Sequence, residues 1–140
     1  MRYTKKIVLG IISLSIGLSG CVQLSMDRMI FDDNEKIVRE ADTYSYITKR
    51  GDVIDQKASF EIRGFYGTDT IYQFEQQGEL TIHLNVDLTS GRFKVVFIDP
   101  QQNITILNSS QTMILNEGTY RIKLVGENAY AKVDMDIIWS

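Results

Sequence analysis

The sequence predicts an all-β fold, namely an antiparallel β-sandwich of about eight strands preceded by a signal peptide and a short tether. Two observations predict it. After residue 43, apolar and polar side chains alternate with a period of two, which is typical of strands with one buried and one solvated face. Turn-forming residues recur between these runs at short intervals, as they do in sandwiches and barrels. Because each strand has a single wet face, we expect two sheets packed over one core.

The chain begins with a segment typical of protein export. Arg2, Lys5 and Lys6 give it a positive start, and residues 7–18 form an apolar run interrupted only by Gly and Ser. A positive start, an apolar stretch and small residues at the end describe a secretory signal. The run is shorter than the roughly 18 apolar residues that a membrane-spanning helix requires. We therefore expect residues 1–20 to be a signal peptide.

The tetrapeptide Leu18-Ser19-Gly20-Cys21 ends this segment, and it resembles the lipobox of bacterial prolipoproteins. The resemblance implies thioether lipidation of Cys21 and cleavage between Gly20 and Cys21. A thiol can be alkylated, and small neighbours leave the backbone accessible. Cys21 is also the only cysteine, so no internal disulfide can use it. The alternative is an ordinary signal peptide whose cysteine happens to lie near the cleavage site.

Charge restricts the partners of the exported part. The full chain of 140 residues has 15 basic and 18 acidic residues. Removal of Arg2, Lys5 and Lys6 with the signal leaves 12 basic and 18 acidic residues, a net charge of −6, in a chain of single-domain length. This balance argues against nucleic acid, which requires a basic face, and against electrostatic docking to anionic lipids. We therefore expect the lipid on Cys21 to be the membrane link, at the extracytoplasmic face of the cell membrane.

Between the lipid site and the strands we expect a linker. Residues 22–30 read as a short tether that would reach roughly 30 Å when extended. Residues 31–41 have an acidic start that suits one or two helical turns. We accordingly assign residues 21–42 to the lipidated cysteine and tether with a short helix, and residues 43–140 to the β-sandwich domain.

The clearest strand covers residues 80–88, and residues 93–97 repeat its alternation after Ser90-Gly91. A two-residue turn there would form a hairpin in which apolar side chains face apolar ones and opposite charges meet outside. The pairs expected from this turn are Leu88 with Phe93, Val86 with Val95, Leu84 with Phe97 and, outside, Asp87 with Lys94.

Residues 120–124 and 131–139 alternate in the same way, and a turn at Glu127-Asn128 would join them. The pairs expected from this second hairpin are Leu124 with Ala131, Ile122 with Val133, Tyr120 with Met135 and, outside, Arg121 with Asp134.

Weaker alternation predicts five further strands, separated by turn signals. The strands are residues 43–49, 58–65, 70–75, 103–107 and 112–115. The turn signals are Arg50-Gly51-Asp52, residues 64–69, Gln77-Gly78, Asp99-Pro100 and Glu117-Gly118.

Few residues suggest catalysis or metal binding. His83, the single histidine, is either a general base or metal ligand, or a polar residue on the wet face of a strand. Asp134 and Asp136 share one face and either bind Ca²⁺ or are simply solvated. No nucleophile–base motif and no second His or Cys near these residues is visible. We expect no catalytic residue, no metal and no cofactor.

Aromatic residues in the first half of the domain are the candidate contacts for a ligand or partner. Tyr44, Tyr46, Tyr66 and Tyr72 could stack on sugar rings or anchor a protein if they point outward, or they could line the core.

A protein partner would instead require an exposed apolar patch. Val96, Ile98 and Ile138 are candidates for it, because they stand on faces that are otherwise polar.

Residues 90–100 (SGRFKVVFIDP) and 117–126 (EGTYRIKLVG) resemble small lipoproteins of Gram-positive bacteria. The resemblance implies a β-sandwich on the cell surface and transfers no activity. We therefore expect a membrane-anchored extracytoplasmic lipoprotein whose domain binds a protein partner or an envelope glycan without catalysis. The alternatives are a structural or accessory subunit of a cell-envelope membrane complex, and an enzyme whose site spans two chains.

Overall fold

The computed structural model describes residues 3–4 and 29–140, and it confirms the all-β prediction. One short helix, α2 (Asn34–Ile37), lies in the described part of the chain. The strands are β1 (Tyr3–Thr4), β2 (Tyr44–Ser45), β3 (Thr48–Ile54), β4 (Lys57–Phe74), β5 (Gly78–Ile98), β6 (Ile104–Leu107), β7 (Gln111–Leu115) and β8 (Tyr120–Trp139). Cys21 and the cleavage site expected beside it lie outside the described residues.

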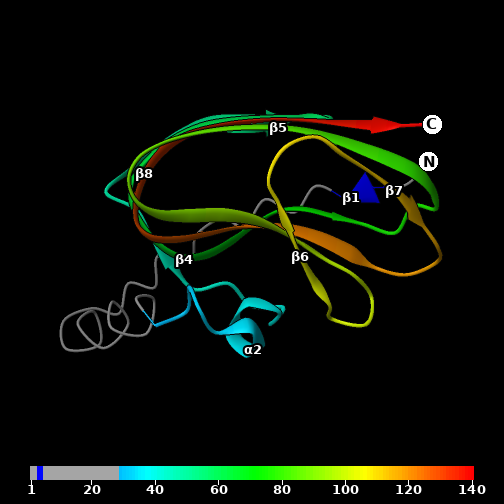
Figure 1. Ribbon diagram of the computed structural model, residues 1–140, viewed down its shortest axis with the longest axis horizontal. Coiled ribbons are helices and arrows are strands. Elements are labelled where there is room, and N and C mark those ends of the chain that lie inside the picture. Colours follow the sequence, from blue (N-terminus) through cyan, green and yellow to red (C-terminus); the bar gives the residue numbers. More distant parts are fainter. Residues whose placement is uncertain (1–2, 5–28) are drawn as a thin grey trace.

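All the strands belong to one antiparallel sheet that folds over itself. Its main order is β1-β4-β8-β5-β6, while β2 and β3 pair with β4, and β7 pairs with β5. Figure 1 shows the long strands β4, β5 and β8 running through both layers of a sandwich and bending between them. The first layer contains β3, β7 and residues 57–62, 80–88 and 131–139; the second contains β2, β6 and residues 67–74, 93–98 and 120–126.

The bend is built from irregularities that line up across the three long strands. The β4–β8 register shifts between Ile62 and Gly67, and the β5–β8 register shifts between Leu88 and Arg92. Such bulges bend a strand and increase its twist. Gly91 has a φ of +79°, and a Cβ on it would stand 1.9 Å from the backbone oxygen of Asn128 in the neighbouring strand. The corner therefore requires glycine at this position.

Both predicted hairpins are wrong. Ser90-Gly91 and Glu127-Asn128 do not reverse the chain but lie opposite each other at the corner. Leu88 pairs with Ala131, and Phe93 pairs with Gly126. A residue that tolerates positive φ serves a tight turn and a bulge equally well, and both arrangements keep the same side chains inside.

Two further turn predictions fail for the same reason. Residues 50–52 lie within β3, and residues 64–69 lie within β4. The reversal between these strands falls at Asp55-Gln56, where Asp55 has a φ of 53°. The remaining three turn signals do lie where strands end or begin, as predicted.

The core fills the space between the two layers. Leu84 and Ile122, which the alternation places inside, are 8% and 0% exposed. Phe74 at the end of β4 makes an edge-to-face contact with Trp139 at the end of β8, with ring centroids 5.4 Å apart. Because these two residues belong to different layers, their contact shows that the folded halves of the sheet pack against each other.

Residues 29–42, which we call the covering segment, lie on the outer face of the second layer and bury a second apolar cluster there. Ile37 of α2 is 0% exposed and packs with Val96 and Ile98, which are also 0% exposed. The predicted exposed patch is therefore wrong for Val96 and Ile98, because a segment distant in sequence covers them. Ile138, at 45% exposed, does face solvent. Figure 1 shows α2 beneath the lower layer of the sandwich.

The helix lies inside the predicted helical segment, and Asp33 caps its start by accepting a hydrogen bond from the Lys36 backbone N–H at 3.2 Å. Ile30 and Phe31 are 6% and 8% exposed in the outer cluster. Packed residues thus begin well before residue 43. Within residues 3–4 and 29–140, no helix has the length and hydropathy needed to cross a bilayer.

Candidate functional site

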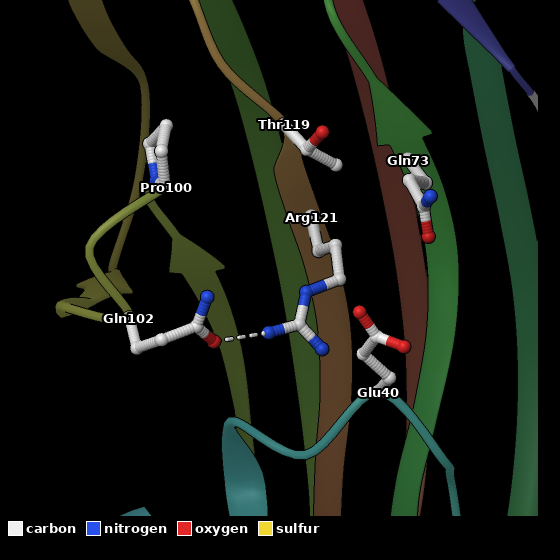
Figure 2. Close-up of a pocket in the computed structure, with 6 residues that line it drawn as sticks. All are labelled: Glu40, Gln73, Pro100, Gln102, Thr119 and Arg121. Atoms are coloured by element: carbon white, nitrogen blue, oxygen red, sulfur yellow. Dashed lines mark hydrogen bonds between the residues drawn. The ribbon is translucent and has the colours of Figure 1, made fainter.

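A polar pocket of about 330 Å³ lies on the outer face of the second layer. It is bounded by the end of the covering segment, the end of β4, the loop after β5 and the start of β8, as Figure 2 shows. The lining residues are Glu40, Gln73, Pro100, Gln102, Thr119 and Arg121. They supply a carboxylate, two amides, a hydroxyl and a guanidinium, so the pocket is suited to hydrogen-bonded recognition.

Arg121 lies at the centre of this pocket and is 5% exposed. Its Nη1 donates to the Arg39 carbonyl at 2.8 Å, and its Nη2 donates to the Val38 carbonyl at 2.6 Å and to Gln102 Oε1 at 2.7 Å. A guanidinium has five N–H donors, so its Nε–H and one Nη1–H are left for a ligand or water. Burial lowers the pKa of Arg121, whereas nearby Asp42 and Glu40 raise it. Arginine stays protonated under such conditions.

The predicted pairing of Arg121 with Asp134 is wrong. Arg121 lies in the first half of β8, on the outside of the second layer, whereas Asp134 lies beyond the corner, on the outside of the first layer. Asp134 instead accepts a hydrogen bond from the Ser59 hydroxyl at 2.7 Å.

A tightly bonded turn presents Gln102 to the pocket. Asp99 Oδ1 accepts hydrogen bonds from the backbone N–H groups of Gln101 and Asn103, both at 2.9 Å. The Asn103 side-chain amide donates to the other carboxylate oxygen at 3.1 Å. Gln102 occupies the left-handed position of this turn, with a φ of 65°. An aspartate that bonds the following backbone in this way is ordinary turn chemistry, and here it fixes one wall of the site.

The loop before β8 packs closely on that turn. Gly118 has a φ of +143°, and a Cβ on it would stand 2.3 Å from Pro100 Cγ. Any other residue would therefore push the loop away from the proline. Next to it, the Thr119 hydroxyl donates to Glu75 Oε1 at 3.2 Å. The pocket wall formed by Pro100 and Thr119 thus depends on glycine at position 118.

A buried ion pair holds the covering segment, and with it Glu40, at the rim of the pocket. Lys123 Nζ lies 2.9 Å from Asp42 Oδ1, and the two side chains are 0% and 1% exposed. Lys123 also donates to the Arg39 carbonyl, and Asp42 accepts from the Thr70 backbone N–H at 2.8 Å. These contacts pair the charges of Lys123 and Asp42, and one of them uses the Arg39 carbonyl, which follows α2. We call residues 38–42 with Arg121 and Lys123 the clamp.

The sequence did not indicate the clamp. Arg121 and Lys123 alternate with apolar residues in the way that the solvated face of a strand does. Their partners lie about eighty positions earlier in the chain. Only the proximity of two cations on one face offered a hint, and nothing local identified Asp42 as a partner.

The four tyrosines predicted as ligand contacts do not form a common platform. Tyr46 stacks on Phe65 with ring centroids 4.5 Å apart, and its hydroxyl donates to Asp69 at 2.7 Å. One face of that ring thus packs on Phe65, and the Lys49 ammonium lies 5.2 Å from the ring centroid, so the ring is held by the protein and does not project outward as a sugar platform would. Their positions are Tyr44 and Tyr46 partly buried against the core, Tyr66 partly exposed on β4, and Tyr72 1% exposed within the core.

Burial also sets the ionisation of Tyr44 and Tyr46, which we call the tyrosine cluster. Desolvation, with nearby Asp69 and Asp42, raises the pKa of Tyr44 to about 12. Desolvation, followed by the charge of Asp69, raises the pKa of Tyr46 well above its ordinary value. Asp69 is itself 2% exposed and lies 2.8 Å from Lys49 Nζ, which pairs its charge. The cluster therefore stays neutral at any physiological pH.

His83 and the aspartates 134 and 136 lie on the open outer face of the first layer. The His83 Nδ1 and the Ser110 hydroxyl share a hydrogen bond of 2.9 Å on the exposed surface. His83 pairs with Asp136 in the sheet register. Among the residues that the structure describes, no group of three or more His, Cys, Asp or Glu side chains is placed to hold a metal.

Comparison of the chain with protein-family models, with curated proteins and with solved structures found no match.

Proposed function

We propose that this chain is a lipid-anchored extracytoplasmic lipoprotein whose β-sandwich binds an envelope glycan or a protein partner at the Arg121 pocket, without catalysis. One observation carries the proposal: Leu18-Ser19-Gly20-Cys21 directly follows a positively charged start and an apolar run. Two or more acyl chains on such a cysteine would anchor the protein stably.

The clamp supports this role because it determines which side of the domain lies near the anchor. Met29 is eight positions after Cys21, so the intervening chain spans at most roughly 30 Å. Residues 29–42 are packed on the second layer. The pocket, on that same face, is therefore held near the membrane surface, where envelope components are abundant. In the proposed mature chain, which begins at Cys21, β1 is absent.

The lining of the pocket favours binding over catalysis. Its ionisable groups are Glu40 and Arg121, and its other polar groups are amides and a hydroxyl. The Thr119 hydroxyl donates to the Glu75 carboxylate at 3.2 Å, but no other described side chain bonds that carboxylate to orient it as a general base. We therefore assign these groups to ligand recognition by hydrogen bonding.

A role as an accessory subunit of a membrane complex is the second candidate. Ile114 on β7 and Ile138 on β8 are 81% and 45% exposed. They lie on the two strands that flank β5, opposite Glu79 and Thr81 respectively. Exposed isoleucines on the open face favour a protein contact, although single exposed apolar residues are common on proteins.

The anchor is tested by expressing the full chain in a bacterium fed an alkyne-labelled fatty acid. We expect label on the wild-type protein and partition into the detergent phase, and neither for Cys21→Ser. Ser15→Ala, within the apolar run, is the control and should behave as wild type. An unlabelled wild-type protein, or a Cys21→Ser variant labelled as strongly, contradicts the anchor.

Binding is tested by cosedimentation of the purified lipidated protein with insoluble cell-wall glycan. The proposal expects the protein in the pellet and its release by soluble wall fragments. If instead the protein stays in solution and crosslinks in the envelope to one membrane protein, the accessory role is favoured.

A further inference from the structure

We infer that the Arg121 pocket accepts a single uncharged sugar ring and holds it through the hydroxyl groups. This inference rests on the proposed binding function and specifies its ligand. It follows from three properties of the pocket: its unpaired hydrogen-bonding groups, its balance of charge and its size.

The pocket offers both donors and acceptors without partners in the described part of the chain. Arg121 has two N–H donors beyond its three hydrogen bonds. The Glu40 carboxylate and the Gln73 amide make no hydrogen bond with any described residue, and both line the cavity in Figure 2. A hydroxyl both donates and accepts, so adjacent hydroxyls on a sugar ring match such a mixed set.

The charges in the pocket favour a neutral ligand. The guanidinium of Arg121 and the carboxylate of Glu40 line the same pocket, and their charges sum to zero. The Glu75 carboxylate, which accepts from Thr119, does not line the pocket. An anionic ligand would approach the Glu40 carboxylate, while a cationic ligand would meet the buried guanidinium. Either would lose part of its attraction by repulsion at short range.

The size and walls of the pocket suit one ring of a longer glycan. Its volume of about 330 Å³ lies at the lower end of the range for ligand sites, roughly 300–1,000 Å³. Pro100 supplies an apolar wall, and its contact with Gly118 fixes that wall in place. No aromatic side chain lines the pocket, so we expect a single site to bind weakly, with a Kd on the order of 1 mM. Many anchored copies on one membrane would raise the avidity for a polymer.

The inference is tested by calorimetric titration of the full lipidated chain in detergent micelles. The probes are the linear tetramer of N-acetylglucosamine, which is neutral, and the tetramer of galacturonic acid, which is anionic. We expect the neutral tetramer to bind at least tenfold more tightly. Gln73→Ala should weaken its binding about fivefold, the effect of one hydrogen bond. Gln101→Ala, in the same turn as Gln102 but not lining the pocket, is the matched control and should leave binding unchanged.

Glu40→Gln distinguishes a neutral ligand from an anionic one by the direction of its effect. Losing the carboxylate should weaken binding of the neutral tetramer, because charged acceptors form the stronger hydrogen bonds. The same change should strengthen the anionic tetramer, because it removes repulsion. Glu40 is exposed, so the variant is expected to fold normally, which its thermal midpoint would verify.

Three results would overturn the inference: no binding of the neutral tetramer at about 10 mM, equal effects of Gln73→Ala and Gln101→Ala, or tighter binding of the anionic tetramer to the wild type. If any of these occurs while the protein still cosediments with insoluble glycan, the binding function stands and only the assignment to this pocket falls. If cosedimentation also fails, the proposed glycan binding falls with it.

Discussion

Replacing Lys123 by methionine is expected to destabilise the domain by releasing residues 38–42 from the second layer. The ammonium of Lys123 lies 2.9 Å from the Asp42 carboxylate, with both side chains almost fully buried. Methionine fills a similar volume but leaves the carboxylate without its cation. Asp42 keeps its hydrogen bonds from the Thr70 backbone N–H and the Thr68 hydroxyl, but two neutral donors are a poor substitute for the ion pair.

The magnitude follows from the burial of the pair. Removing one partner of a buried ion pair costs about 3–5 kcal/mol, because the remaining charge is uncompensated. A domain of this size has a free energy of unfolding of roughly 5–15 kcal/mol. At about 4 °C per kcal/mol, Lys123→Met should lower the Tm by roughly 12–20 °C. Combining it with Asp42→Asn removes the charge but keeps an acceptor for the Thr70 N–H. The double variant should therefore recover to within about 1–2 kcal/mol of the wild type.

The assay is urea unfolding followed by the fluorescence of Trp139, the single tryptophan. Lys132→Met is the matched control, because Lys132 lies on the same strand but is exposed, and it should change stability by less than about 0.5 kcal/mol. Equal effects of the two lysine variants would refute the reasoning. So would a double variant as unstable as the sum of its single changes, because the coupling of the pair would then be absent.

Three further predictions concern the corner, the tyrosine cluster and the outer apolar cluster. Gly91→Ala should cost at least about 1–3 kcal/mol from backbone strain, with more from the clash across the corner, whereas Ser90→Ala should leave the thermal midpoint nearly unchanged. Folding raises the pKa of both Tyr44 and Tyr46. Such a group contributes its full stabilisation below the pKa of the unfolded state, about 10 for tyrosine, and loses that contribution as the pH rises through the pKa of the folded state. Stability measured from pH 10 to 12 should therefore fall, and the slope should flatten in Tyr44→Phe and in Tyr46→Phe; an unchanged slope in both would count against the raised pKa values. Ile37→Ala should cost about 2–5 kcal/mol in chemical denaturation, because its side chain is fully buried, and a change below about 1 kcal/mol would show that α2 is not packed as described.

The in–out pattern of the long strands could be predicted from the sequence because it depends on nearest neighbours. Alternation at residues 80–84 and 120–124 placed the apolar side chains inside, and Leu84 and Ile122 are buried as expected. The pairing partners could not be predicted in this way. Leu88 opposite Phe93 and Leu88 opposite Ala131 satisfy the same alternation, so the pattern does not distinguish a hairpin from two long bent strands.

The candidate site was less accessible to prediction. The lining residues come from four separate segments, and each is unremarkable in its own stretch of sequence. Arg121 was expected on a solvated face opposite Asp134, and Tyr72 was expected among possible ligand contacts. Both are buried, because neighbouring parts of the fold cover them. Alternation predicts that a strand has one apolar and one polar face. Whether the polar face contacts solvent or is covered depends on other chain segments, whose positions alternation does not predict.

By itself, then, the sequence determined the all-β class and the inward direction of the core side chains, and it supplied the resemblance to a lipobox on which the proposed anchor rests. The tertiary structure decided that Gly91 and Asn128 form a corner, that residues 29–42 cover Val96 and Ile98, and that Arg121 and Glu40 line one pocket. The physical reason is the distance along the chain over which each interaction acts. Strand preference and alternation are local properties, whereas the corner, the clamp and the pocket each gain their stability only when distant segments are already side by side.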